Sequence, residues 1–230
     1  MRLPGNRIDR RHSMMDGEPG GYFTRARLEV LPYLPQRCDN VLDVGCGSGA
    51  TVEAIRVHRD VAWAGGIEID PAAAAAARGH LDYLYEGDVA SAPLEEVLGP
   101  GSLDLVLCLD VLEHLVDPWS TVHRLTPLLA PGGRLVVSVP NIRNWKFIWR
   151  LLTKGDFRYR DSGLLDRTHL RFFVRETAAE LACCGGLKLV ACDNATRYRA
   201  SEMRAWISRA TGGRADTLLA KQFIVVATPQ

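Results

Sequence analysis

Residues 41–50, VLDVGCGSGA, constrain the fold of this 230-residue chain more than any other segment. Their first four residues are apolar apart from Asp43, which is typical of a buried strand, and Gly45, Gly47 and Gly49 follow at alternate positions. Glycine permits the tight turn and the close approach of backbone to ligand that a nucleoside site needs. The segment therefore predicts a strand, a binding turn and a helix, the first unit of an α/β fold.

The charge before the turn narrows the choice of ligand. The glycine spacing alone also fits the G-x-G-x-x-G/A fingerprint of dinucleotide-binding proteins. Asp43 lies two residues before Gly45, where a carboxylate would repel a pyrophosphate. The same carboxylate would attract the ammonium and sulfonium groups of S-adenosylmethionine. The sign of the charge thus favours the methyl donor over a nicotinamide or flavin dinucleotide.

Two further acidic residues follow predicted strands. Glu68 lies 23 positions after Gly45, a spacing that suits an acceptor for ribose hydroxyls. Asp88 follows the next apolar run and is placed to accept a hydrogen bond from the adenine amino group. Further residues expected at the cofactor are Cys46, Ile69, Val89 and Leu109.

Strand and helix patterns alternate along most of the chain. The predicted strands are 40–44, 63–68, 82–86, 104–109, 133–139, 187–196 and 221–228. The predicted helices are 24–34, 50–58, 71–79, 118–128 and 174–185. This alternation predicts a doubly wound, mostly parallel sheet of seven strands, with the ligand beyond the carboxyl ends of the strands.

Residues 22–141 resemble class I S-adenosylmethionine-dependent methyltransferases. Five phrases along the chain carry a narrower resemblance: VLDVGCGSG, GIEID, LDVLEHL, LAPGGRLVVSVPNIRNW and GLLDRTHLRFF. They are similar to a bacterial branch that methylates small molecules, with ubiquinone-methyltransferase-like domains and domains of methyltransferase types 11 and 23. The resemblance implies a Rossmann-like fold and S-adenosylmethionine as the cofactor. It also implies that Tyr22 contacts the methionine part of the cofactor, with packing alone as the alternative.

Composition is that of one globular domain. The chain is 47% hydrophobic and 24% charged, and no apolar run reaches the roughly 18 residues of a membrane span. We expect a flexible tail over residues 1–21 and a single methyltransferase domain over 22–230. The tail lacks the apolar core of a secretory signal, and the six cysteines lack C-x-x-C spacing. Reduced thiols and a cytoplasmic location are therefore expected.

A basic segment interrupts the alternating pattern at 142–175. Between residues 143 and 175 there are nine Lys or Arg and three Asp, whereas residues 28–142 hold six Arg and sixteen Asp or Glu. We interpret the segment as a cap that receives an anionic small-molecule acceptor. Alternatively, its arginines pair with the acidic domain. No nucleic-acid recognition module accompanies the charge, so nucleic acid is not an expected partner.

The cap begins with a short predicted helix over 145–152 that mixes aromatic and basic residues. Three interpretations are open for this helix. It could pack on the core as a lid, dock on a membrane surface, or contact the substrate directly.

Methyl transfer is an in-line displacement, so alignment of donor and acceptor supplies much of the catalysis. A hydroxyl acceptor also needs a base, whereas an amine does not. His169 is the preferred catalytic base, with Asp166 orienting it, and His114 is the further candidate. The alternative is a structural turn in which Asp166 and Thr168 bond backbone groups and His169 is simply buried.

Asp110, Glu113 and His114 are spaced so that a helix or turn could place them on one face. Some quinone-type O-methyltransferases hold a metal with a similar acid-x-x-Glu-His phrase, which this chain resembles. The same phrase also occurs in relatives without a metal. We therefore expect a structural or cofactor-side role for this loop, and no bound metal.

The sequence predicts an enzyme that methylates a hydroxyl of an anionic or sugar-like metabolite. One alternative is N-methylation of an amino sugar or another amine, which would depend less on His169. The other is a non-catalytic protein that keeps the cofactor fold and acts as a partner in a biosynthetic complex. Intact Asp43, Glu68 and Asp88 speak against that last alternative. The sequence leaves the oligomeric state open.

Overall fold

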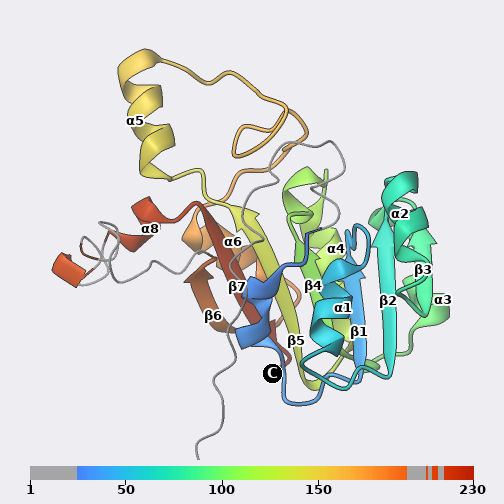
Figure 1. Ribbon diagram of the computed structural model, residues 1–230. Helices are drawn as coiled ribbons and strands as arrows, with labels where there is room; N and C mark the ends of the chain where they lie inside the picture. Colours follow the sequence, from blue (N-terminus) through green and yellow to red (C-terminus); the bar gives the residue numbers. More distant parts are fainter. Residues whose placement is uncertain (1–24, 196–205, 207–208, 212–214) are drawn as a thin grey trace, which may run out of the picture.

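A single seven-stranded sheet forms the centre of the molecule in the computed structural model, which describes residues 25–195, 206, 209–211 and 215–230 (Figure 1). Its strands are β1 (Asn40–Val44), β2 (Trp63–Glu68), β3 (Tyr83–Glu86), β4 (Leu103–Leu109), β5 (Leu129–Pro140), β6 (Lys188–Asn194) and β7 (Gln222–Thr228). The strand order is β3-β2-β1-β4-β5-β7-β6. β1 to β5 pair in parallel, and β7 runs antiparallel to both of its neighbours. The predicted doubly wound, mostly parallel sheet is confirmed.

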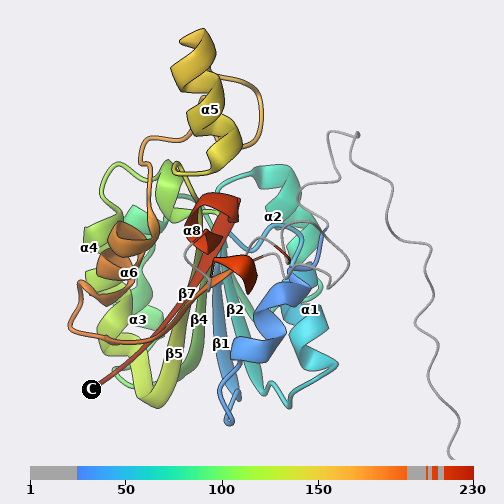
Figure 2. The same cartoon turned by 90° about the vertical axis from the view of Figure 1, so that its left-hand side faces the viewer.

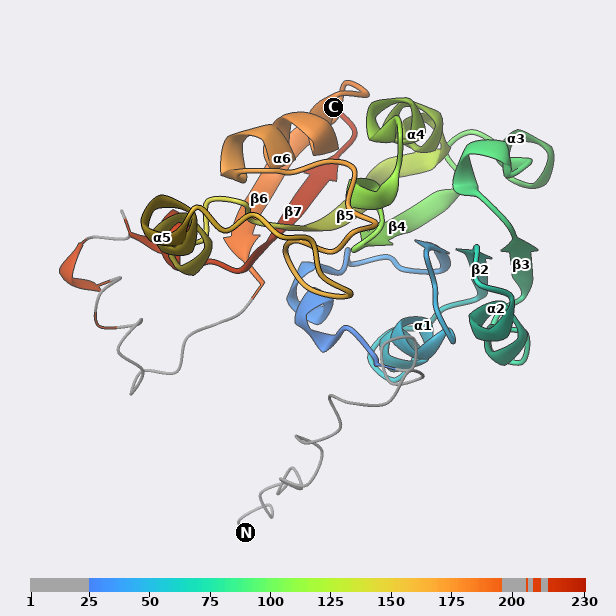
Figure 3. The same ribbon diagram turned by 90° about the horizontal axis from the view of Figure 1, so that it is seen from above.

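Helices cover both faces of the sheet (Figure 3). One face carries α3 (Leu94–Val97), α4 (Pro118–Leu125) and α6 (Arg175–Cys183), and the other carries η1 (Leu28–Tyr33), α1 (Ala50–Arg56) and α2 (Pro71–Ala77). The remaining elements are η2 (Val89–Ser91), η3 (Leu112–His114), η4 (Thr126–Leu128), α5 (Trp145–Lys154) and α8 (Asp216–Leu219).

The central strand β4 shows why the sheet needs cover on both faces. All seven of its residues are buried, as expected for a strand in the middle of a parallel sheet. Leu105 and Leu107 point to the core beneath η1 and α1, whereas Val106 and Cys108 point to the larger core beneath α4 and α6. The alternation of side chains along the strand thus divides the apolar residues between two cores.

Several boundaries differ from the sequence prediction. The helix expected over 24–34 is only the short 3-10 helix η1, because Pro32 lies inside it and has no backbone N–H to continue an α-helical ladder. Similarly, Pro127 ends α4 early, and η4 follows. β5 begins at Leu129, four residues before the predicted start. The four-residue helix α3 was not predicted, since it is too short to show a periodic pattern.

The segment predicted as a cap leaves the sheet and returns to it at one point. Ile142 N donates to Phe173 O at 2.9 Å, and Asn141 and Phe173 form an isolated parallel bridge. Between these ends lies α5 with a long irregular return, and both stand above the carboxyl edge of the sheet (Figures 1 and 2). The helix predicted over 145–152 is therefore confirmed, and it extends to Lys154.

The turn after β1 leads to a testable expectation for stability. Gly45 has φ +71°, and a Cβ built on it would lie 2.3 Å from Val111 Cγ2. Gly45→Ala should therefore lower the free energy of unfolding by about 2–4 kcal/mol. Thermal denaturation should show this as a fall in Tm of about 5–10 °C.

Gly79→Ala is the matched control. A Cβ at Gly79 meets no atom within 4 Å, and its φ is not positive, so its Tm should stay close to that of the unchanged protein. Equal melting temperatures for Gly45→Ala and Gly79→Ala would show that Val111 does not press on the turn.

Candidate active site

The glycine turn after β1 lies at the carboxyl edge of the sheet, in contact with two neighbouring strand ends. Gly45, Gly47 and Gly49 all have positive φ, so three left-handed residues alternate with ordinary ones. Gly45 N and Cys46 N both donate to Ile67 O of β2, at 2.8 and 3.1 Å. The turn is therefore held against β2 on one side, while Val111 abuts it on the other.

Glu68 braces the same turn from the end of β2. Its two carboxylate oxygens accept from Gly47 N at 2.8 Å and from Asp70 N at 2.9 Å, and the residue is 5% exposed. A carboxylate oxygen has two lone pairs, so both oxygens keep acceptor capacity for a ligand. The position is consistent with the predicted contact to ribose hydroxyls, which stays a prediction.

Asp43 lies beneath the turn with an unsatisfied carboxylate. It is 2% exposed, and its Oδ1 has no hydrogen-bond partner. Burial and the neighbouring charge of Glu68 raise the pKa of Asp43 to about 7, although Arg27 partly opposes this. A buried carboxylate without a partner is costly, and a cation placed beside it would remove that cost. The carboxylate thus suits the cationic end of the expected cofactor.

Asp110 follows β4, and three side chains from distant parts of the chain donate hydrogen bonds to its carboxylate. Arg27 and Gln222 both donate to its carboxylate, and Ser138 Oγ donates to its Oδ1 at 3.0 Å. Asp110 is also the one described residue other than glycine with positive φ, at +59°. The sequence grouping of Asp110 with Glu113 and His114 is therefore not reproduced, because the carboxylate of Asp110 turns to Arg27.

His169 takes the place of Asp110 in that group. Glu113, His114 and His169 each offer a ligand atom, and these atoms lie within 4.8 Å of one another. The two imidazole rings meet edge to face, with centroids 4.7 Å apart. Glu113 O accepts from the backbone N–H groups of Leu170 and Arg171 at 2.8 and 3.0 Å, which fastens the cap to η3. We call Glu113, His114 and His169 the Glu-His-His cluster.

Hydrogen bonds define the tautomers of both histidines. His114 Nδ1 lies 3.2 Å from Thr168 O, and His169 Nδ1 lies 3.1 Å from Leu164 O. Because a carbonyl oxygen only accepts, each Nδ1 must carry the hydrogen. Each Nε2 is then left with a free lone pair, able to accept a proton or to bind a cation.

The predicted partnership of Asp166 with His169 is wrong. Asp166 Oδ1 instead accepts from Thr168 N at 2.8 Å and from Thr168 Oγ1 at 2.7 Å. Since Thr168 Oγ1 donates to Asp166, it accepts from His114 Nδ1–H, 3.0 Å away. Asp166 thus orients His114 through Thr168, and Leu164 O orients His169. The turn interpretation described Asp166 correctly, whereas the hydroxyl of Thr168 bonds the side chains of Asp166 and His114 and not a backbone group. A turn residue that selects a histidine tautomer leaves no sequence signature.

The cluster is buried enough to shift its protonation. Glu113 is fully buried, and neither of its carboxylate oxygens has a hydrogen-bond partner. Burial and the nearby charge of Asp110 raise the pKa of Glu113 well above its usual range. Burial and the neighbouring His169 lower the pKa of His114, which favours the neutral imidazole.

The geometry of this edge agrees with comparisons to known proteins. A family profile described as a methyltransferase domain matches residues 15–191. A ubiquinone biosynthesis O-methyltransferase of Xylella fastidiosa (strain M23) is 31% identical over 186 residues, covering 74% of each chain. The chain belongs to the S-adenosylmethionine-dependent methyltransferases. A second relative with the same name, from Xanthomonas campestris pv. campestris (strain B100), is 32% identical over 160 residues, covering 64% of this chain and 65% of its own.

Solved structures support the fold of this methyltransferase. A SAM-dependent methyltransferase from Archaeoglobus fulgidus has a TM-score of 0.62 at 17% identity, covering 88% of this chain and 91% of its own. The [4+2]-cyclase SpnF also matches, with a TM-score of 0.55 at 20% identity, covering 88% of this chain and 79% of its own. At such identities the likeness concerns the fold alone. The cofactor of the methyltransferase is S-adenosylmethionine, as the glycine turn and Asp43 indicated.

The other predicted cofactor residues surround the turn in different ways. Asp88 is exposed and caps η2, where its Oδ1 accepts from Ala90 N at 2.9 Å. Ile69 is 68% exposed beside Glu68, a position open to a flat ligand. Val89 and Leu109 are buried in the two cores, so their side chains support the site from below. Tyr22 and the predicted tail over 1–21 lie outside the described residues.

Asp43 should make cofactor binding by the methyltransferase depend on pH. Since S-adenosylmethionine is cationic, it binds the ionised carboxylate better, and its affinity should rise by up to about tenfold per pH unit below the pKa of about 7. Calorimetric titration of the unchanged protein and of Asp43→Asn checks this. The difference between the two affinities should grow as pH rises, and a constant difference would exclude Asp43 as the titrating group.

Asp43→Asn should weaken cofactor binding, but it should raise the stability of the folded protein at alkaline pH. The pKa of Asp43 is raised in the folded state, so its favourable contribution is present below the unfolded-state pKa and is lost as pH rises through about 7. Asp43→Asn should therefore melt above the unchanged protein at alkaline pH and approach it in acid. A lower Tm at alkaline pH would contradict a cost of ionising Asp43.

The cap arginines pair mainly within the cap. Arg158 and Arg167 pair with Asp156 and Asp161, each at 2.9 Å, and Arg150 and Arg160 lie within 4.0 Å of Asp156. One interpretation expected these arginines to pair with the acidic domain. Their ion pairs instead stay within the cap.

Among the described residues, no helix is long and apolar enough to cross a membrane.

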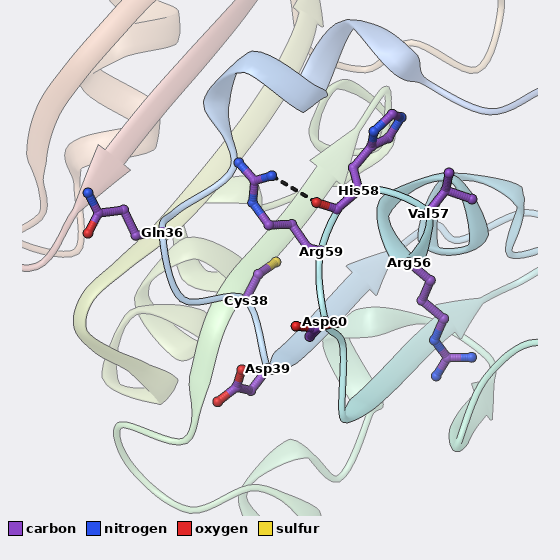
Figure 4. A pocket seen from close by; sticks show the side chains of 8 residues that line it. All are labelled: Gln36, Cys38, Asp39, Arg56, Val57, His58, Arg59 and Asp60. Carbon is purple, nitrogen blue, oxygen red and sulfur yellow. Dashed lines mark hydrogen bonds between the residues drawn. The ribbon is translucent and has the colours of Figure 1, made fainter.

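A polar pocket of about 360 Å³ lies elsewhere, where the loop before β1 meets the end of α1 (Figure 4). Arg59 Nη1 donates to His58 O there at 2.8 Å, and Arg56 is engaged by Asp82 at 2.8 Å. Cys38 is buried, and burial raises the pKa of its thiol to about 11, which keeps it protonated. This pocket lies at the amino end of β1, away from the glycine turn, and takes no part in the site.

Proposed function

We propose that the protein transfers the methyl group of S-adenosylmethionine to a hydroxyl oxygen of a small-molecule acceptor. The observation that carries this proposal is the Glu-His-His cluster, which provides two imidazole Nε2 lone pairs next to a buried carboxyl group. An amine acceptor would not need such a proton-accepting set. The names of the curated relatives, which are O-methyltransferases of ubiquinone biosynthesis, support the same acceptor atom.

In the proposed reaction the acceptor oxygen attacks the methyl carbon while the bond from that carbon to sulfur breaks. S-adenosylhomocysteine leaves, and the hydroxyl proton passes to Nε2 of His169. Leu164 O stabilises the resulting imidazolium through Nδ1–H. His114 stays neutral beside it, because its lowered pKa disfavours a second charge. The cap, anchored through Glu113 O, excludes water and orients the acceptor.

The cluster also fits a divalent cation, although the sequence predicted no metal. Two imidazoles held by hydrogen bonds at Nδ1 and an unpartnered carboxylate are the donor types that transition metals prefer. When bound there, such a cation would lower the pKa of a coordinated hydroxyl. Glu113 would then be ionised, which removes the cost of its unsatisfied oxygens.

The acceptor remains a small molecule, and an anionic or sugar-like character is part of the proposal. This part of the proposal rests on the charge of the cap, where residues 143–175 hold nine Lys or Arg and three Asp. Phenols, sugar hydroxyls and amines should be screened with methyl-labelled cofactor, and the methylated product analysed by mass spectrometry and NMR.

The expected product carries a new carbon–oxygen bond, and products with new carbon–nitrogen bonds alone would overturn the proposal.

A second measurement tests the cation at the cluster: Zn²⁺ or Mn²⁺ is titrated by calorimetry into the unchanged protein and into Glu113→Gln. Binding that Glu113→Gln abolishes supports the cation at the cluster. Unchanged turnover after chelation, together with no binding heat, would leave His169 as the base without a metal.

A further inference from the structure

The outer face of α5 exposes large apolar side chains that no described residue covers. Trp145 is 43% exposed, Trp149 65% and Leu152 77%. Their spacing of four and three residues places them on one stripe of the helix. Monomeric proteins rarely expose three such side chains in a row without a partner.

Basic residues accompany this stripe, and α5 carries no acid. Its charged residues are Lys146, Arg150 and Lys154, and Lys146 Nζ lies 6.0 Å from the ring of Trp145. Lys146 and Lys154 are exposed. Lys146 lies beside the stripe, whereas Lys154 lies at the end of the helix on the side of Phe147. We call Trp145, Lys146, Trp149 and Leu152 the α5 outer face.

The opposite side of α5 fixes the helix to the body of the protein. Phe147 is 5% exposed, and its ring meets Phe157 edge to face at 5.6 Å. Asn144 caps the helix and donates to Ala220 O at 2.8 Å. α5 is thus a ten-residue amphipathic helix held outward above the carboxyl edge of the sheet (Figures 1 and 2).

We propose that the α5 outer face docks on the surface of an anionic lipid membrane. Tryptophan prefers the boundary between head groups and acyl chains, and lysine binds acidic head groups, so this combination is typical of interfacial helices. A protein partner would satisfy the apolar stripe equally well, but the absence of acid from α5 favours a uniformly anionic surface.

Flotation with lipid vesicles tests the proposal without reference to catalysis. The full chain is mixed with vesicles of phosphatidylcholine alone or of phosphatidylcholine with phosphatidylglycerol. Binding is expected only to the anionic vesicles, and it should weaken as salt rises. Trp149→Ala should lower the partition coefficient by about tenfold or more, and Lys146→Gln by about fivefold.

Matched controls separate docking from a loss of folding. Trp119 of α4 is 42% exposed outside this face, so Trp119→Ala should bind as the unchanged protein does. Lys188→Gln, on β6, is the corresponding charge control. Equal binding by Trp149→Ala and Trp119→Ala would overturn the proposal, as would a lack of binding to anionic vesicles. A dimer in light scattering that Trp149→Ala dissociates, without vesicle binding, would assign the face to a second copy instead.

Discussion

His169→Ala should lower turnover by a factor of about 100 or more, with little change in the affinity for S-adenosylmethionine. In the proposed mechanism, Nε2 of His169 takes up the hydroxyl proton of the small-molecule substrate. His169 lies in the cap and not in the glycine turn that binds the cofactor, so the cofactor affinity should stay the same. Initial rates with the acceptor identified by the screen, and calorimetry with the cofactor, measure the two quantities separately. A loss of turnover alone places His169 in the chemical step.

His123→Ala is the matched control for this substitution. His123 is exposed on α4, outside the cluster, and should leave both quantities unchanged. If His169→Ala retained full turnover, His169 could be neither the base nor a necessary ligand. His169 is only 9% exposed, so its replacement could destabilise the fold. The Tm of His169→Ala should therefore first be compared with that of the unchanged protein, so that a folding defect is not taken for a catalytic one.

Glu68→Ala should weaken the binding of S-adenosylmethionine by about 100-fold or more. The substitution removes the acceptor that holds Gly47 N and Asp70 N, and with it the predicted acceptor of the ribose hydroxyls. Hydrogen bonds to a charged group contribute about 1.5–3 kcal/mol each, so losing two such contacts produces this change in affinity. Calorimetric titration with S-adenosylhomocysteine gives the same comparison without turnover.

Glu86→Ala provides the control, because Glu86 ends the neighbouring strand β3 and pairs with Arg78 at 2.7 Å on the surface. Its cofactor affinity should equal that of the unchanged protein. Glu68→Gln should fall between the two, since it keeps one acceptor oxygen but loses the charge. Similar affinities for Glu68→Ala and Glu86→Ala would mean that Glu68 neither shapes the turn nor meets the ribose.

The sequence predicted the sheet well because its signals are local. Alternating apolar runs and turn residues defined all seven strands, and the positive-φ glycines mark the turn after β1. Asp43 and Glu68 could be placed at one edge, since parallel strands end on the same side. Misplaced boundaries such as that of η1 came from a proline inside a helical pattern.

Contacts between distant segments were not predictable in the same way. Arg27, Ser138 and Gln222 converge on Asp110 from three parts of the chain, and no spacing rule connects them. Likewise, the sequence offered Asp110 as a companion of Glu113 and His114. The folded cap instead supplies His169, because backbone bonds from Leu170 and Arg171 to Glu113 O fix its return path.

Calorimetric titration of the purified full chain with S-adenosylmethionine, S-adenosylhomocysteine and NAD tests the central claim most directly. The glycine turn, Asp43 and Glu68 predict micromolar binding of both adenosyl compounds and no heat with NAD. Binding of NAD in their place, or of none of the three, would contradict the assignment of this edge of the sheet to the methyl donor.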